Sequence, residues 1–208
     1  MEKIIKHKGL VVPINRSNID TDLIIPKQFL KAINSSGFGL NLFDGLRYID
    51  EGYPGKKNRL INKDFVLNKS RYKGASILLT RKNFGCGSSR EHAVWALKEY
   101  GFKIIIAQSF AEIFYNNALK NGILIITVKK NLIKDLFLSV CKEKGYMVNI
   151  NLPKQILYNK SGKKFKFTID PFSKYCLENG LDDIGITFKE IKLIKKFEHI
   201  HNKKNPWL

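Results

Sequence analysis

Between residues 76 and 145, short apolar runs alternate with amphipathic segments, and this alternation constrains the fold more than any other feature. The apolar runs have the length of buried strands, and the segments between them carry apolar residues at helical spacing. Strands and helices joined by short links favour a parallel sheet that helices cover. We therefore expect an α/β fold with a mostly parallel sheet flanked by helices. The expected strands are 76–80, 103–107 and 123–128, and the expected helices are 88–100, 109–121 and 131–144.

Serine and glycine residues indicate where these helices begin and end. Ser88 with Glu91, and Ser109 with Glu112, match the S-x-x-E capping box in which a serine side chain starts a helix. A glycine after a periodic segment favours the left-handed backbone that ends a helix. The expected helix stops are Gly101, Gly122 and Gly145.

The N-terminal region predicts one more strand, at 9–14, and a helical turn at 27–33. Residues 34–75 follow and are the least regular part of the chain. A stretch of this kind is a functional loop, an interface or a solvated insertion. Because no repeat or linker interrupts the sequence, we expect one domain over residues 1–208 with an irregular insertion at about 34–75.

The C-terminal part predicts antiparallel strands and further helices. Ser161-Gly162 is typical of a hairpin, here between 154–160 and 163–169. Asp170-Pro171 then opens a helix that ends near Gly180, because proline suits the first helical position. The last expected element is an amphipathic helix to about residue 198, begun by a capping box of Thr187 and Glu190.

The formal charge of +19 suggests a nucleic-acid-binding module, but the distribution of charge argues against it. Only six of the 37 basic residues are arginines, and arginine is the residue preferred for reading bases and forking phosphates. The lysines are scattered from Lys3 to Lys204, and the abundance of Lys, Ile and Asn is typical of an AT-rich coding sequence. We expect no nucleic-acid partner, although the charge would attract anionic substrates.

Other features of the composition bear on location. No apolar run approaches the roughly 18 residues that a membrane span needs, so we expect no membrane association. The N-terminus is charged where a signal peptide would be apolar. Three cysteines far apart, with no C-x-x-C pair, favour a reducing compartment. We expect a cytoplasmic protein.

The stretch NFGCGSSREHA, residues 83–93, carries the clearest chemical signal. Cys86 is a poor candidate nucleophile, because His92 would lie a helical turn further on and face away from the loop. It is also a poor metal ligand, because zinc and iron–sulfur sites normally use closely spaced cysteines. A small residue between Gly85 and Gly87 is more simply part of a tight turn.

Ser88, Ser89 and Arg90 stand where a glycine-rich turn meets a helix start, and such a start can bind anions. Arg90 adds a planar fork that suits a carboxylate. From these residues alone, an alternative remains open in which Ser88 only caps the helix and Arg90 pairs with a neighbouring acid. A phosphate-binding loop is disfavoured, because the G-x-x-x-x-G-K-[ST] pattern is missing.

NFGCGSSREHAVWAL closely resembles the serine–arginine motif of the aconitase superfamily, in its small swivelling domain. Two further stretches agree in order and spacing, NIDTDLIIPKQFL at 18–30 and KIIIAQSFAEIFYNNALKNGILII at 103–126. KFTIDPF and NGLDDIGIT extend the resemblance over nearly the whole chain, and the length resembles the family of bacterial 3-isopropylmalate dehydratase small subunits. The resemblance implies a swivelling β/β/α-type domain with a C-terminal hairpin and helices.

The resemblance also implies an activity and a partner. Such enzymes are hydro-lyases that isomerise 2-isopropylmalate to 3-isopropylmalate by removing and re-adding water, in leucine biosynthesis. A [4Fe–4S] cluster in a separate large subunit acts as Lewis acid, and the chains are active together as a heterodimer or heterotetramer. This chain is expected to bind no metal or cofactor itself. The alternative is a related hydro-lyase acting on homoaconitate, or on citraconate and methylmalate.

By the same resemblance, Ser88 is the catalytic base, and it takes a proton from the carbon beside a carboxylate. Ser89 and Arg90 hold a substrate carboxylate. The helix terminus and the Arg90 cation would stabilise the Ser88 alkoxide, which is otherwise a difficult species to form. The remaining expected site residues are Thr21, Asp22 and Lys27, with Ile33 and Phe38 in a specificity loop at about 29–38.

Overall fold

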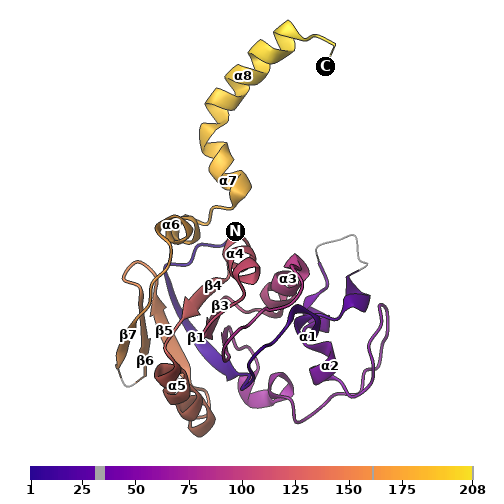
Figure 1. Ribbon diagram of the computed structural model, residues 1–208, viewed down its shortest axis with the longest axis vertical. Helices are drawn as coiled ribbons and strands as arrows, with labels where there is room; N and C mark the ends of the chain where they lie inside the picture. The colour runs from indigo at the N-terminus through magenta and orange to yellow at the C-terminus, as the bar shows by residue number, and fades with distance from the viewer. Residues whose placement is uncertain (31–35, 161, 208) are drawn as a thin grey trace.

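The computed structural model describes residues 1–30, 36–160 and 162–207, which form a seven-stranded mixed sheet with helices around it (Figure 1). The strand order is β4-β3-β2-β1-β5-β6-β7. Four strands are parallel, β1 (Lys6–Pro13), β2 (Ile77–Leu79), β3 (Ile104–Ala107) and β4 (Leu124–Thr127). Three antiparallel strands continue from β1, and these are β5 (Met147–Asn151), β6 (Ile156–Asn159) and β7 (Lys164–Lys166).

The α/β class and the strands expected from apolar runs are confirmed. Every residue of β2 and β3 is buried, as continuous apolar runs in a parallel sheet require. The hairpin at Ser161-Gly162 is also confirmed, since β6 and β7 pair antiparallel on either side of it. The sequence reading missed β5, whose burial alternates along MVNIN. That two-residue period is typical of a half-buried strand. With β5 included, the described sheet has three parallel and three antiparallel strand pairings.

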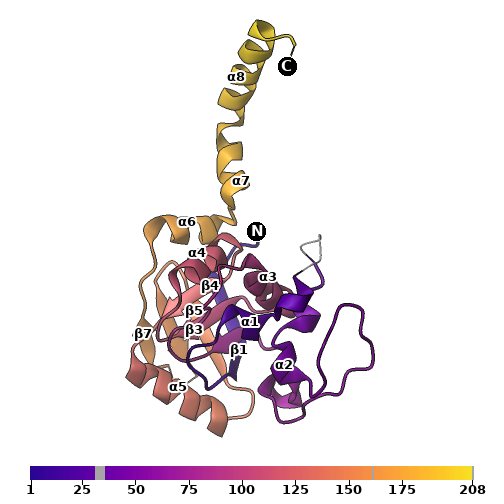
Figure 2. The ribbon, with the colours of Figure 1, turned by 45° about the vertical axis from the view of Figure 1, so that its right-hand side comes forward.

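The helices cover the sheet in separate groups. Helices α1, α3 and α4 lie side by side, whereas α5 packs on β1 and lies apart from them in both views (Figures 1 and 2). The short α2 follows α1 in the chain and packs on it. The bounds are α1 Thr21–Ile24, α2 Asp44–Arg47, α3 Glu91–Tyr100, α4 Glu112–Lys120, α5 Lys130–Lys142, α6 Pro171–Asn179, α7 Asp183–Thr187 and α8 Ile191–Lys204.

The three expected capping boxes are wrong. Helices α3 and α4 begin at Glu91 and Glu112 themselves, three residues later than expected. The Glu91 carboxylate accepts a hydrogen bond from the Asn121 side chain (2.7 Å), so it does not reach back to the helix start. The Ser109 hydroxyl accepts from the Asn83 backbone N–H (2.9 Å) and thereby ties two loops together. Thr187 lies inside α7 and donates to the Asp183 carbonyl (2.9 Å).

The helix start at Asp170-Pro171 and the glycine stops at Gly101 and Gly122 agree with the structure, but the expected stop at Gly145 is wrong. Helix α5 ends at Lys142, where the extended backbone of Glu143 leaves the helix before the glycine. Asp170 accepts from the Ser173 N–H (2.8 Å) at the start of α6, with Pro171 in the first position. Gly180 ends α6 in the left-handed conformation, as Gly101 does for α3. These signals worked because their partners lie within the same helix turn, where no tertiary contact competes.

The region at 36–75 is packed onto the body through short helical turns and polar contacts. Leu42 and Phe43 are fully buried, and the Glu99 carboxylate of α3 accepts from the N–H groups of Gly37 and Gly39 (3.0 and 2.9 Å). Arg59 holds the far side of the region through an ion pair with buried Asp44. This stretch is therefore tied to α3 by direct contacts rather than solvated throughout.

Residues 183–207, named here the C-terminal arm, project away from the sheet in both views (Figures 1 and 2). The arm comprises α7, a 3-10 turn at Phe188–Glu190, and α8, which confirms the expected last amphipathic helix. Within the described part of the arm, no residue of α7 or α8 is buried. Among residues 1–30, 36–160 and 162–207, no helix is long and apolar enough to cross a membrane.

Candidate functional site

The loop that follows β2 runs beside the segment that follows β1, and backbone hydrogen bonds join them. Asp20 and Cys86 form an isolated parallel bridge. The Gly85 N–H donates to the Ile19 carbonyl (2.7 Å), and the Thr21 N–H donates to the Cys86 carbonyl (2.9 Å). The two stretches that resemble the aconitase superfamily are thereby brought to one edge of the sheet, as the carboxyl ends of parallel strands require.

The Thr21 side chain joins these two stretches next to Ser88, the expected catalytic base. Its hydroxyl donates to the Ser88 carbonyl (3.0 Å), and the residue itself is buried. Asp20, just before it, caps α1 by accepting from the Leu23 N–H (2.7 Å). Because Thr21 is buried and both its N–H and its hydroxyl donate hydrogen bonds, it fixes the position of the Ser88 backbone.

Gly85 and Gly87 shape the loop by adopting left-handed backbone, with φ of +76° and +89°. At Gly85 a Cβ atom would lie 2.1 Å from Cγ of Phe114 in α4, so only glycine lets this helix approach the loop. At Gly87 a Cβ would lie 3.4 Å from that of Asp20. The glycines therefore bring α4 and the segment at 18–22 into contact with the loop.

We expect Gly85→Ala to lower the free energy of unfolding by about 2–5 kcal/mol, summing about 1–3 for overpacking and about 1–2 for left-handed backbone. Gly74→Ala is the matched control. Gly74 has φ of +78° but nothing within 4 Å of a built Cβ. Urea unfolding of both variants measures the difference, and an equal loss at the two positions would contradict the packing argument.

Ser88 and Ser89 are exposed at the mouth of the site, just before α3. Arg90 occupies the N-cap position with extended backbone, and within the described residues no side chain caps α3. In that same part of the chain, neither serine hydroxyl makes a hydrogen bond. The sequence left open whether Ser88 only caps the helix. In the part of the chain that the structure describes, the Ser88 hydroxyl does not cap α3.

Arg90 forms an ion pair with Asp22 through a single guanidinium nitrogen, Nη1. The Asp22 side chain is exposed, whereas the Arg90 side chain is half-buried. An ion pair with an exposed partner is weak in water, so a substrate carboxylate can compete for or share the guanidinium. Arg90 thus pairs with a neighbouring acid, as the alternative left open by the sequence expects, and it also keeps guanidinium donors that a ligand can use.

A cleft of about 200 Å³ lies between this loop and the start of α4. The first turn of a helix has N–H groups without partners inside the helix, and they favour anions. Helices α3 and α4 both begin at this cleft, which suits a substrate with more than one carboxylate. Its lining residues are Thr21, Gly85, Gly87, Ser88, Ser89, Arg90, Ala111, Glu112, Ile113, Phe114 and Asn117.

The sequence reading missed the contribution of α4, which supplies Glu112, Ile113, Phe114 and Asn117 to the cleft. The sequence does contain an indication of this contribution. SFAEIF follows the strand next to β2, so it must emerge at the same edge of a parallel sheet. The isolated bridge between Phe84 and Phe110 confirms that the two loops run side by side.

The other expected site residues are placed differently. Lys27 is exposed in a 3-10 turn and is not among the residues that line the cleft. Phe38 is 2% exposed and packs edge-on against the His92 ring, with centroids 5.2 Å apart. Ile33 lies outside the described residues, so its contacts with a substrate stay a prediction.

Cys86 contributes its backbone to the site through the bond from Thr21, and its thiol is half-buried. Iron–sulfur clusters are held by several thiolates. In the described part of the chain, no group of three or more His, Cys, Asp or Glu side chains could hold a metal ion. The donor set of the described residues therefore does not fit a [4Fe–4S] cluster.

The fold and this site define the class of protein. The aconitase C-terminal domain family matches residues 1–131, which include the sheet from β1 to β4 and all residues of the cleft. The chain is also 54% identical over 210 residues to 3-isopropylmalate dehydratase small subunit 1 of Bordetella parapertussis and of Bordetella bronchiseptica. These matches cover 100% of this chain and 97% of each relative.

A solved structure agrees with these matches. The crystal structure of 3-isopropylmalate dehydratase from Methanocaldococcus jannaschii has a TM-score of 0.63 and 29% sequence identity, and covers 93% of this chain and 99% of its own. The chain therefore belongs to the aconitase C-terminal domain family and, within it, to the small subunits of 3-isopropylmalate dehydratase.

Proposed function

We propose that this chain interconverts 2-isopropylmalate and 3-isopropylmalate together with a large subunit that carries a [4Fe–4S] cluster, as a step of leucine biosynthesis. The observation that carries the proposal is the gathering of Thr21, Ser88, Ser89 and Arg90 around one cleft. The names of the curated relatives support the substrate and the existence of a larger partner. Three free cysteines also support a cytoplasmic location.

In this proposal Ser88 moves the proton. Its Oγ, as an alkoxide, accepts the proton from the carbon beside a substrate carboxylate, while the hydroxyl on the neighbouring carbon departs as hydroxide, so that the substrate loses the elements of one water and becomes an alkene. The reverse steps, with the hydroxyl added at the other carbon, complete the isomerisation. The cluster, when the partner brings it, supplies Lewis acidity to the departing hydroxyl.

The residues around Ser88 support this role electrostatically. Ser89 and Arg90 bind the carboxylate, and the guanidinium of Arg90 offers it a planar fork of donors. The dipole of α3 and the Arg90 cation both favour a negative charge on the Ser88 oxygen. Asp22 holds the Arg90 side chain in place before substrate binds, and Thr21 holds the Ser88 backbone.

The substrate class is tested with the purified chain mixed with its large subunit. The values of kcat/KM for hydration of 2-isopropylmaleate, citraconate and homoaconitate are compared. We expect 2-isopropylmaleate to be preferred over citraconate, because lost methyl contacts in an apolar pocket cost about 10- to 200-fold. A preference for homoaconitate, a tricarboxylate, would contradict the proposed substrate and favour the related hydro-lyase.

A further inference from the structure

The C-terminal arm carries an apolar stripe with no partner among the described residues. In α8, Leu193, Phe197 and Ile200 follow at spacings of four and three, which places them on one face of the helix. Leu193 is 63% exposed and Phe197 is 67% exposed. Ile184 and Phe188 add exposed apolar surface nearer the body. Isolated amphipathic helices are marginal in water and gain most of their stability from packing of the apolar face.

Exposed lysines border the apolar stripe of α8. By helical spacing Lys192, Lys196 and Lys203 lie along one side of the stripe, and Lys195 lies nearly opposite it. Within the described residues, no ion pair involves any of these lysines. The arm therefore presents both an apolar stripe and a row of unpaired positive charges to whatever covers it.

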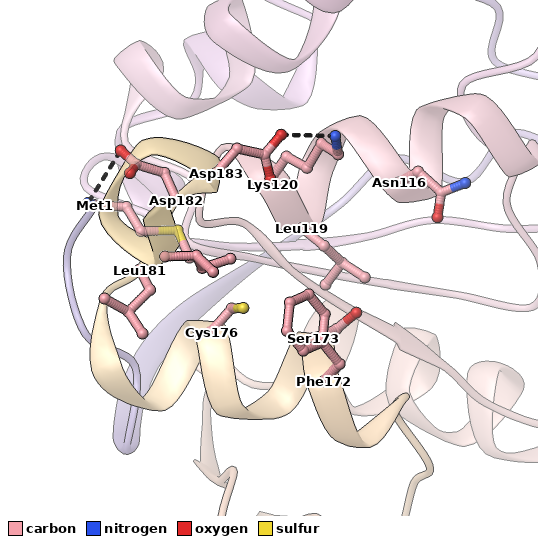
Figure 3. A pocket seen from close by; sticks show the side chains of 11 residues that line it. Met1, Asn116, Leu119, Lys120, Phe172, Ser173, Cys176, Leu181, Asp182 and Asp183 are labelled. Atoms are coloured by element: carbon pink, nitrogen blue, oxygen red, sulfur yellow. Dashed lines mark hydrogen bonds and ion pairs between the residues drawn. The ribbon is translucent and has the colours of Figure 1, made fainter. Parts of the chain in front are cut away.

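A pocket of about 250 Å³ lies at the base of the arm, between α4, α6 and α7 (Figure 3). Its floor is apolar, with Leu119, Phe172 and Leu181 in the lining. Its rim is polar, because Lys120 bonds Asp183 (2.8 Å) and the N-terminal ammonium lies 3.9 Å from Asp182. A pocket with this shape and rim suits an apolar protein side chain better than a lipid chain.

Helix α4 connects this pocket with the candidate active site. Ile113, near its start, lines the cleft, whereas Asn116 and Lys120 line the pocket at the base of the arm. All three are exposed, and spacings of three and four place them on one face of α4. One continuous surface therefore runs from the cleft along α4 to the arm.

We propose that the arm and the pocket at its base form a docking surface for the large subunit, and that the matching surface of the large subunit is apolar with acidic groups. The inference rests on the proposed function, in which the partner must reach the cleft to deliver its cluster. A partner that covers the cleft along α4 also reaches the base of the arm.

Two other partners for this surface, a second copy of the chain and a membrane, fit it less well. A second copy would bring its own +19 and would meet a basic arm with like charge. An anionic membrane would suit the lysines and the stripe, but it would leave the rimmed pocket unused. An acidic, apolar protein surface satisfies the stripe, the lysines and the pocket together.

The test measures affinity by titrating the purified large subunit into the full-length chain, without substrate. The double variant Leu193→Asp, Phe197→Asp is expected to weaken binding by at least about 100-fold, as for loss of two anchoring side chains. Leu138→Asp is the matched control, because Leu138 is an equally exposed helical leucine (71%) in α5, away from the arm. We expect its affinity to stay within about twofold of the unmodified chain.

The outcomes separate this inference from the proposed function. If the unmodified subunits assemble and hydrate 2-isopropylmaleate while the double variant binds equally tightly, the arm inference is overturned and the function stands. If the unmodified mixture binds but hydrates none of the three acids, the function fails instead. The arm inference is also overturned if the double variant abolishes self-association of the chain, or binding to phosphatidylserine vesicles, while its affinity for the large subunit stays unchanged.

Discussion

Replacing Ser88 by alanine is expected to lower kcat for 2-isopropylmaleate hydration by about 10²–10⁴-fold, the usual loss when a positioned base or acid is removed. Among the described residues the Ser88 hydroxyl at the cleft makes no hydrogen bond, and Thr21 holds the Ser88 backbone, so the variant should keep the loop in place. The steady-state rate of the assembled enzyme measures the effect.

Ser89→Ala is the control, because it removes the same hydroxyl from the adjacent residue. Ser89 is proposed to bind a carboxylate rather than move the proton, so its loss should raise KM more than it lowers kcat. Unfolding of the free chain in urea should be the same for both variants, since both side chains are exposed. Full activity of Ser88→Ala in the assembled enzyme would remove Ser88 from the mechanism.

Replacing Arg59 by alanine is expected to cost about 3–5 kcal/mol of unfolding free energy, because it leaves a buried carboxylate unpaired. Asp44 is 2% exposed, and the Arg59 guanidinium donates a hydrogen bond to each of its carboxylate oxygens, at 2.6 and 3.1 Å. The pKa of Arg59 is raised, chiefly by its hydrogen bond to Asp44. The guanidinium also lies over the Tyr48 ring, 4.0 Å from its centroid. Urea unfolding measures the loss.

The double variant Asp44→Leu, Arg59→Met distinguishes an unpaired charge from lost packing. Removing both charged partners leaves no buried carboxylate, so this variant should be more stable than Arg59→Ala. Arg59→Lys should lie between Arg59→Ala and the unmodified chain, because lysine keeps the charge but loses the fork. A double variant as unstable as Arg59→Ala would contradict the electrostatic account.

The sheet could be predicted because its parallel strands appear in the sequence as apolar runs of strand length. Residues 76–80, 103–107 and 123–128 contain β2, β3 and β4, and no end differs by more than one residue. The glycines after α3 and α6 ended those helices because their backbone preference acts locally. Strand β5 was missed because its alternating pattern is short and follows a helix stop.

The helix starts could not be predicted, because the side chains expected to cap them hydrogen-bond to residues far away in the sequence. Glu91 binds Asn121, thirty positions away in the sequence, and Ser109 binds Asn83 across two loops. A pattern of local residues does not contain such contacts. At the site, the motif predicted Ser88 and Arg90, and the strand order could have predicted that α4 begins at the same edge of the sheet. How closely α4 approaches the loop depends on the packing at Gly85.

The placement of Phe38 also depends on packing that the sequence does not contain. The resemblance predicts contact with the substrate side chain, and the structure places Phe38 against His92 and Trp95, with the ring centroids 5.2 and 5.9 Å apart. His92 belongs to the serine–arginine motif itself, so Phe38 packs directly on the helix that begins at the site. Its role toward a substrate stays a prediction.

The central claim is that this chain holds the proton-transfer half of a two-subunit hydro-lyase, and one measurement tests it most directly. The rate of 2-isopropylmaleate hydration is measured for the purified chain, for the large subunit with its cluster, and for the two together. We predict that neither subunit has activity alone and that their mixture does. Equal activity of the large subunit with and without this chain would contradict the account.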